Sequence, residues 1–372
     1  GDPATAIYQR DPGVEKKPVP ALSLSDYLFP ALQIGYLRGG AEGRNSALML
    51  SASDWGGHHH VDSLNLVWWQ NGTEQLSDLG YLWDHPLKTM TTRTLAHNTV
   101  MIDGEDQQTT GRGGKFLLFE SSRGIKVMEA ESRAYPKADM YRRTVTQIET
   151  APGQRYVMDI FRVRGGTQHD YVFHGPNNAL TSAASIAQET QSIPGKPLDL
   201  VNLSRLTPIS GQISLTWKTG ENKAFTALWP TEPEEVAFRG DGWGQLDYKN
   251  SDAGATLPYI VRRRTGIPGD HSPAVFAGVF EGHEAAGGSV RTLTRLPVPA
   301  AEAANTVALR VETGFGVDYV VSCVEPRPVT IATDAGPLTV SGRFAVVRTV
   351  KGSAVGSLLV GGKQLQWRGK RL

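Results

Sequence analysis

The most informative stretch of the sequence reads DWGGHHHVDSLN, residues 54–65, and it runs directly into the apolar segment LVWWQ. In an extended chain, side chains alternate between two faces with a period of two. One face then carries polar residues followed by apolar ones, in the order His58, His60, Asp62, Leu64, Leu66 and Trp68. The pattern predicts a strand over Ser63–Gln70 that is buried along its length and begins at a histidine-rich end.

The rest of the chain repeats short β-rich runs between turns. Its 372 residues include 41 Gly and 22 Pro, and helical periodicity is scarce. Regularly spaced short strands are typical of an all-β sandwich. We therefore predict an all-β fold, one large antiparallel β-sandwich with room for a small terminal β-subdomain. Beyond the first strand, the predicted strands are Thr99–Ile102, Lys115–Glu120, Thr144–Glu149, Tyr156–Val163, Asp170–His174, Gln212–Trp217, Ala224–Trp229, Tyr259–Arg264, Ala274–Glu281, Thr306–Glu312, Asp318–Val324 and Arg343–Thr349.

Two parts of the chain lack this regular spacing of strands. Residues 1–25 are rich in proline and charge and are interpreted as a linker, which leaves 26–372 for the sandwich. A soft boundary is predicted near 230–255, where acidic and glycine residues interrupt the strands. Helical candidates are few and short, such as Ser25–Gln33. The polar opening Gly1-Asp2-Pro3 suggests that further sequence precedes this chain.

Charge and composition exclude several classes of function. The formal net charge of +1 gives no global argument for nucleic-acid binding, which usually requires a strongly basic face. It leaves open a local basic groove for an acidic sugar polymer. No run reaches the roughly 18–20 apolar residues of a membrane span. Cys323 is the only cysteine, so neither an internal disulfide nor a thiolate zinc cluster can form.

The histidines of the opening stretch suit a metal ion. Neutral imidazole is the commonest protein ligand for zinc, and two histidines at i and i+2 on a strand can share one ion. Asp78 and His97 lie at the edges of predicted strands and are candidates for the remaining ligands. Hydrogen-bonded structural histidines fit the spacing equally well.

One feature of the sequence opposes a simple metal site. Asn71-Gly72 predicts a two-residue hairpin, in which residue 70 lies opposite 73 and residue 65 opposite 78. His60 would then lie about 17 Å along the strand from the partner of Asp78, at roughly 3.4 Å per residue. The two side chains can share a metal only if the chain bends or bulges.

Taken in order, these segments resemble the heparinase II/III-like polysaccharide lyases. The resemblance rests on a His-x-His-x-Asp-x-Leu element at residues 58–64, followed by Asn71-Gly72, Asp78-Leu79-Gly80-Tyr81, Ala96-His97-Asn98-Thr99-Val100 and Asp103-Gly104. The match is strong over about residues 28–175 and diffuse thereafter. The resemblance implies an antiparallel β-sandwich that normally follows an N-terminal α-helical toroid. The substrate lies between the two parts and is a uronic-acid polymer such as alginate, heparin or heparan sulfate, which is cleaved by β-elimination.

The resemblance also implies roles for individual residues. His58 is similar to the histidine that faces the substrate, and His60, Asp78 and His97 to the ligands of a structural zinc ion. Asp62 and Asn98 would then orient these ligands. The family's other catalytic groups come mainly from the toroid, so the chain alone is expected to be incomplete. A periplasmic or secreted location is expected for such a protein.

Three further residues are candidates for contacts with substrate: Arg93 through its charge, Tyr81 through its hydroxyl and Trp55 through stacking on a sugar face. The run Arg262-Arg263-Arg264 is interpreted as a solvated strand face. The main alternative is a carbohydrate-binding sandwich without catalytic activity. A zinc hydrolase is disfavoured, because the sequence has neither a His-Glu-x-x-His motif nor a Gly-x-Ser-x-Gly motif.

Overall fold

The computed structural model of the protein describes residues 23–54, 59–80, 87–122, 124–182, 186–189, 192–244, 254–266, 272–284 and 286–372. Within these ranges nearly every regular element is a β-strand, and neighbouring strands pair antiparallel. The predicted all-β fold of antiparallel sheets is confirmed. Helical elements in the described ranges are single short turns: η1 (Ala41–Gly43), α2 (Thr89–Thr92), η2 (Thr94–Ala96) and η3 (Ala300–Glu302).

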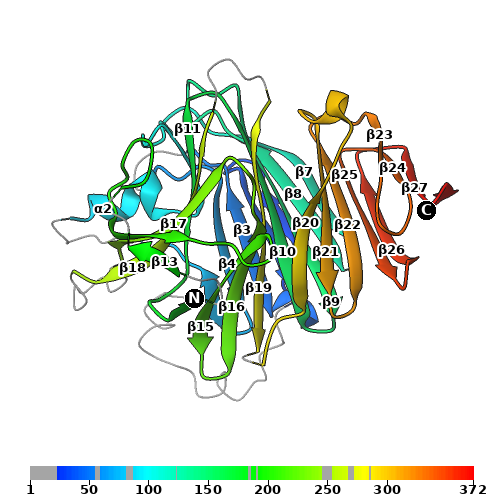
Figure 1. The fold of residues 1–372 in the computed structure, drawn as a ribbon, viewed down its shortest axis with the longest axis horizontal. Coiled ribbons are helices and arrows are strands. Elements are labelled where there is room, and N and C mark those ends of the chain that lie inside the picture. Colours follow the sequence, from blue (N-terminus) through cyan, green and yellow to red (C-terminus); the bar gives the residue numbers. More distant parts are fainter. Residues whose placement is uncertain are drawn as a thin grey trace, which may run out of the picture.

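The described strands form five sheets (Figure 1). An N-terminal sheet has the order β1 (Tyr27–Phe29), β2 (Ile34–Gly39), β3 (Ser46–Ser51), β4 (Asn65–Gln70), β5 (Thr73–Leu76). The eight-stranded sheet has the order β12 (Leu180–Ser182), β15 (Gln212–Gly220), β16 (Lys223–Pro230), β19 (Ala274–Glu284), β10 (Gln154–Arg164), β9 (Met140–Ala151), β8 (Ile125–Glu131), β7 (Lys115–Ser122). The six-stranded sheet has the order β13 (Ile186–Glu189), β14 (Val201–Leu206), β17 (Glu235–Trp243), β18 (Thr256–Thr265), β11 (Gln168–His174), β6 (Thr99–Ile102).

Two further sheets complete the C-terminal end. The first has the order β20 (Val290–Leu296), β21 (Thr306–Thr313), β22 (Gly316–Cys323), β25 (Phe344–Val350), β26 (Ser353–Val360). The second has the order β23 (Pro328–Ile331), β24 (Leu338–Ser341), β27 (Gln364–Trp367), β28 (Lys370–Arg371). Figure 1 places this last sheet at the outer end of the molecule, beside the chain's C-terminus.

Strands β10 and β19 at the centre of the eight-stranded sheet are buried on both faces, which explains why most of their residues are apolar. On β10, Val157 and Phe161 face the core shared with the N-terminal and six-stranded sheets. Tyr156, Met158 and Ile160 face a second core, shared with the sheet of β20–β26. A strand buried on both faces needs no polar side. The stack therefore continues from the largest core into the C-terminal sheets.

Two local predictions are wrong. Ser25–Gln33 is not a helix, because its middle forms β1 and a turn then leads into β2. Arg262 and Arg263 are not solvated, since each is only 2% exposed on β18. Their guanidinium groups bind the carboxylates of Glu235 and Asp170. A carboxylate from a neighbouring strand, which the local sequence does not reveal, makes this burial tolerable.

The predicted linker and sandwich limits, with the soft boundary near 230–255, stay predictions. No helix in the described ranges is long and apolar enough to cross a membrane.

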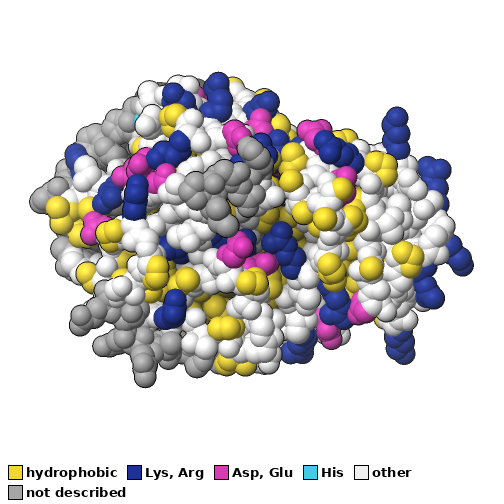
Figure 2. Space-filling model, turned by 45° about the horizontal axis from the view of Figure 1, so that its top comes forward, with side chains coloured by type: hydrophobic (Ala, Val, Ile, Leu, Met, Phe, Trp, Pro, Cys, Tyr) yellow, Lys and Arg dark blue, Asp and Glu magenta, His cyan; other side chains and the backbone are white. Residues whose placement is uncertain are grey.

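Although the net charge of the chain is small, charged residues are unevenly distributed along it. Residues 338–372 contain seven Lys or Arg and no Asp or Glu, and Figure 2 shows such basic side chains at the C-terminal end of the molecule.

Candidate metal centre

Two loops bring the predicted ligands together. The segment from His60 leads towards β4, and the segment from Thr92 to His97 leads towards β6. The Val61 N–H donates to the carbonyl of Thr92 at 2.9 Å, and the Thr94 hydroxyl donates to the carbonyl of Val61 at 2.7 Å. These bonds hold the two segments side by side, so that His60 lies next to His97.

A sharp turn before β4 resolves the distance problem raised by the sequence. Leu64 has a φ of 63°, and the Asn65 N–H donates to the carbonyl of Asp62. The extended conformation considered for this stretch is therefore wrong from Asp62 to Asn65. Positive φ is unusual for leucine, but its buried side chain packs in the main core.

The predicted hairpin is confirmed, because Gln70 pairs with Thr73 across Asn71-Gly72. A register shift follows at once: Trp69 pairs with Glu74, but Trp68 pairs with Leu76. This bulge adds one residue to β5 and re-aims the segment after it. Turn and bulge together place Asp78 within 3.7 Å of His60.

The three side chains converge on one point. The distance from His60 Nδ1 to His97 Nε2 is 2.8 Å, and from His97 Nε2 to Asp78 Oδ2 it is 3.4 Å. His60, Asp78 and His97 form a group whose ligand atoms all lie within 4.8 Å of one another. Ligands of tetrahedral zinc at about 2.0–2.2 Å stand about 3.3–3.5 Å apart. The contact of 3.4 Å between His97 and Asp78 fits that spacing, and the contact of 3.7 Å between His60 and Asp78 is slightly longer. The two imidazoles would separate by about half an ångström.

The tautomer of His97 also suits a metal. Its Nδ1 lies 2.7 Å from the carbonyl of Arg93, and only a protonated nitrogen can bond there. A neutral His97 therefore presents the lone pair of Nε2 to the centre. Ligand histidines commonly donate their other nitrogen in this manner.

The pKa values of Asp78 and His97 are both strongly shifted. Burial alone would raise the pKa of Asp78, but hydrogen bonds from His60 and His97 hold it well below its usual range. Burial alone would lower the pKa of His97, but the Asp78 carboxylate beside it raises that pKa to about 9. An anionic carboxylate facing two imidazoles is a site that attracts positive charge.

The residues expected to orient the ligands act less directly than predicted. Asn98 is fully buried and donates to the backbone carbonyls of Leu66 and Ser77, so it positions Asp78 through the chain. Asp62 accepts a long hydrogen bond of 3.4 Å from the amide of Asn65.

Asn65 was missed by the sequence analysis. Its amide donates to Asp62 and, at 3.2 Å, to Asp78, and its Oδ1 accepts from the Asn98 N–H. The position before an apolar strand gave no sign of this role, which depends on the turn at Leu64.

Arg143, also missed, supports the centre from the core side. Its guanidinium is fully buried and donates to the carbonyls of Leu64 and Asn98. It also forms a bidentate pair with Asp159, at 2.8 and 2.7 Å. One side chain thus joins the turn before β4 to the segment after His97.

The predicted contacts with substrate remain predictions. The Arg93 side chain is ion-paired with Asp106 and Asp199 at 3.1 and 3.2 Å. Three of the proposed residues, His58, Trp55 and Tyr81, lie outside the described residues.

Comparisons with known proteins agree with the motif series. The model of the family "Heparinase II/III-like, C-terminal" matches residues 25–245. A search among curated proteins finds no match. Heparan sulfate lyase HepC from Pedobacter heparinus is similar in structure, with a TM-score of 0.63 and 12% identity over 84% of this chain and 45% of that one. The heparinase III BT4657 gene product has a TM-score of 0.62 and 12% identity, over 82% of this chain and 43% of its own.

These structural relatives share the fold at low identity, and the chain spans less than half of the length of either. The family match itself covers more than half of the chain. The resemblance inferred from the motifs is confirmed: the chain belongs to the heparinase II/III-like, C-terminal family of polysaccharide lyases.

Proposed function

We propose that this chain is the substrate-facing β-part of a polysaccharide lyase that cleaves uronic-acid-containing polysaccharide, alginate or a heparin-like polymer, by β-elimination. The observation that carries the proposal is the convergence of His60, Asp78 and His97 in a chain of this family. A carbohydrate-binding module would need aromatic and cationic contacts but no such ligand set.

The ion proposed for the centre is zinc in a structural role. Two imidazole nitrogens and one carboxylate oxygen are a common donor set for zinc. When bound, the ion would crosslink three segments of the chain. His60 stands two residues after His58, so a fixed His60 would also fix the backbone from which His58 projects.

β-Elimination requires loss of the C5 proton of a uronate and expulsion of the sugar linked through O4. The C5 proton becomes acidic only when the neighbouring carboxylate is neutralised by donors or positive charge. A general base then removes the proton, and an acid protonates the leaving oxygen. We assign His58 to the uronate, where it would assist charge neutralisation or proton transfer.

The proposal includes a partner, an N-terminal α-helical domain in the same precursor or a separate chain. Two considerations support it: the family's remaining catalytic groups lie mainly in such a domain, and the chain spans 45% of the length of the lyase HepC. A polymeric substrate of this kind also favours a periplasmic or secreted location.

The first test is elemental analysis of the purified wild type, His60→Ala and His97→Ala. The partly exposed His283 on β19 offers a matched control as His283→Ala. We expect about one zinc per wild-type chain and per control chain, and loss in both site variants. Absence of zinc from the metal-replete wild type would overturn the metal assignment.

The second test measures absorbance near 235 nm, where the unsaturated product absorbs, with alginate and heparan sulfate as substrates. The chain is assayed alone and together with the helical domain. We expect product only when both parts are present, and less of it with His58→Ala. A zinc-loaded complete protein that binds these polymers without forming product would favour the carbohydrate-binding alternative.

A further inference from the structure

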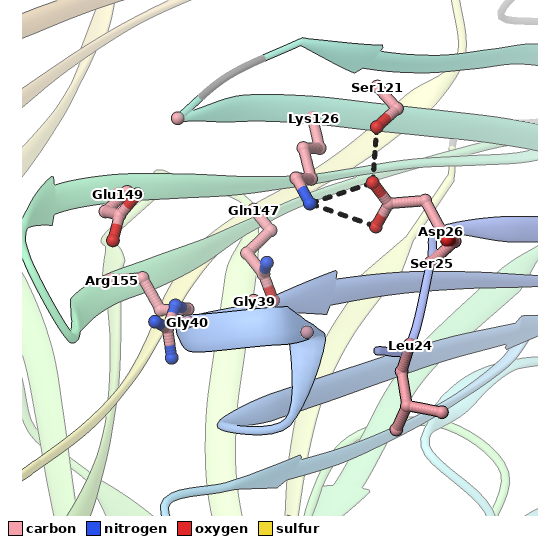
Figure 3. A pocket seen from close by; sticks show the side chains of 12 residues that line it. Leu24, Ser25, Asp26, Gly39, Gly40, Ser121, Lys126, Gln147, Glu149 and Arg155 are labelled. Atoms are coloured by element: carbon pink, nitrogen blue, oxygen red, sulfur yellow. Dashed lines mark hydrogen bonds and ion pairs between the residues drawn. The ribbon is translucent and has the colours of Figure 1, made fainter. Parts of the chain in front are cut away.

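A polar pocket opens between the N-terminal sheet and the eight-stranded sheet, away from the candidate metal centre (Figure 3). Its volume is about 420 Å³. The residues that line it include Asp26, Gly39, Lys126, Gln147, Glu149 and Arg155. This is enough space for a small ligand with several polar groups.

The pocket is separate from the metal centre. Strand β9 connects the two regions: Tyr141 at one end bonds Thr99 and Gln107 beneath the centre, and Glu149 near the other end lines the pocket. These two positions on an extended strand are roughly 27 Å apart. A ligand in the pocket therefore cannot touch the metal centre directly.

Arg155 is the unusual residue of this pocket. It is only 1% exposed, and neither Nη1 nor Nη2 has a hydrogen-bond partner among the described residues. Glu149 lies opposite it in the strand register and its charge acts on Arg155, but in the described part of the chain no ion pair within 4 Å joins the two. A guanidinium stays protonated even when burial lowers its pKa, as it does here.

The other buried arginines of the described chain behave differently. Arg143, Arg262 and Arg263 each bind a carboxylate, and Arg162 donates to the carbonyl and hydroxyl of Ser322. A buried charge without a partner is costly by several kcal/mol. Both Nη atoms of Arg155 thus lack the acceptors that the other buried arginines of the described chain find.

Nearby groups do not supply that anion. The Asp26 carboxylate is already bound by Lys126, at 2.8 and 3.1 Å, and by the hydroxyl of Ser121. Gly39 leaves room for the guanidinium. A Cβ at this position would come within 2.8 Å of Arg155 Nε and of Gln147 Nε2. Figure 3 shows the Arg155 side chain apart from the Asp26–Lys126 pair.

We propose that this pocket binds a small hydroxylated monoanion, a sugar acid, whose carboxylate pairs with Arg155. Guanidinium groups bind carboxylates through two parallel hydrogen bonds. Glu149 would accept hydrogen bonds from hydroxyl groups, and its charge together with that of Asp26 disfavours a dianion such as phosphate. Binding at this pocket requires neither zinc nor cleavage of a polysaccharide. The proposal can therefore be tested independently of the proposed function.

The test compares glucuronate with glucose, which lacks the carboxylate, by calorimetric titration and thermal denaturation. Glucuronate should raise the melting temperature of the wild type saturably, and glucose should not. Arg155→Met should abolish the response, and Arg155→Lys should weaken binding about tenfold, because lysine lacks the planar fork. Arg164→Met, which removes a partly exposed arginine paired with Asp139, is the control and should respond as the wild type does.

Two further arms keep the test decisive. Without ligand, Arg155→Met should melt no lower than the wild type, since it removes an unpaired buried charge. If that variant fails to fold, Arg155→Lys and Gly39→Ala must both weaken glucuronate binding for the proposal to stand. Sulfate at matched ionic strength tests the preference for a monoanionic carboxylate: a weaker response than to glucuronate supports the proposal, and an equal response would overturn it. Equal responses to glucose and glucuronate, or an unchanged response in the Arg155 variants, would overturn the proposal.

Discussion

Two neighbouring polar clusters differ in how their charges are balanced. One is centred on Arg143, and the other is the group of His60, Asp78 and His97. In the Arg143 cluster, the guanidinium finds Asp159, the hydroxyl of Tyr171 and two backbone carbonyls, so the chain itself satisfies every donor. In the candidate metal centre, the imidazoles of His60 and His97 and the carboxylate of Asp78 point their possible ligand atoms at one another. The first cluster is complete as folded, and the second has the composition of a site that an ion completes.

The largest effect is expected from breaking the complete cluster. Arg143→Met leaves Asp159 as an unpaired buried charge, which typically costs about 3–5 kcal/mol. Chemical denaturation in the presence of a chelator, which isolates this loss from any effect on metal binding, should show a loss of that size. The double variant Arg143→Met/Asp159→Leu should recover part of the loss. A double variant no better than the single one would argue against the unpaired charge as the cause.

Metal removal should separate the two clusters. Free zinc at about a hundred times its Kd stabilises a folded protein by about 2.7 kcal/mol. Denaturation of the wild type should therefore show a chelator-dependent loss of this order, and His97→Ala should show no zinc dependence. Zinc that stabilises His97→Ala as much as the wild type would place the ion elsewhere.

A smaller effect is expected from Asn65→Ala, which removes the amide that donates to Asp78. Loss of a group that holds a metal ligand typically lowers affinity about 10–100-fold. Competition with a chromophoric chelator measures this directly. Asn177→Ala, at an exposed amide bonded to Lys218, should leave zinc affinity unchanged. Unaltered affinity in Asn65→Ala would make this amide dispensable.

The smallest effect concerns Asp103, a carboxylate that the chain satisfies at its surface edge. Burial alone would raise its pKa, but donors from Thr167, Lys137 and Gln168 hold the pKa well below its usual range. A carboxyl whose pKa is lowered by folding stabilises the protein above its unfolded-state pKa of about 3.9, and this stabilisation is lost as pH falls towards the folded-state pKa.

Asp103→Asn should therefore cost about 1.5 kcal/mol at pH 7, the lower end of the usual contribution of a hydrogen bond to a charged group. The difference from the wild type should shrink below about pH 4. Urea denaturation at pH 7 and pH 3 checks this, and a chelator should change neither result. A difference that stays constant with pH would assign the loss to side-chain packing rather than to charge.

Most strands could be predicted because each carries its own signal. Runs such as Tyr156–Val163 and Ala274–Glu281 lie within β10 and β19, since burial on both faces required apolar residues at nearly every position. The segment Ser25–Gln33 carried no such signal. The burial of Arg262 could not be predicted either, because it depends on an ion pair with Glu235, which lies on a neighbouring strand and is distant in sequence.

The candidate site was predicted in its ligands but not in its geometry. The order of the motifs identified His60, Asp78 and His97, which the structure brings together. The turn at Leu64 and the bulge on β5 could not be predicted, because both are imposed by packing against other strands. For the same reason, Asn65 and Arg143 could not be recognised: their partners are mainly backbone carbonyls and side chains brought close by the turn.

The pairing of β10 has a consequence for how the molecule folds. Tyr156 on β10 pairs with Glu281 on β19, so the central sheet closes only after a long intervening segment has been synthesised. Folds dominated by such distant contacts fold slowly, and incomplete intermediates expose strand edges that aggregate. The family match ends at residue 245, before β19 begins. A fragment cut at that limit would leave the edge of β10 open, so we expect it to depend on chaperones or to aggregate.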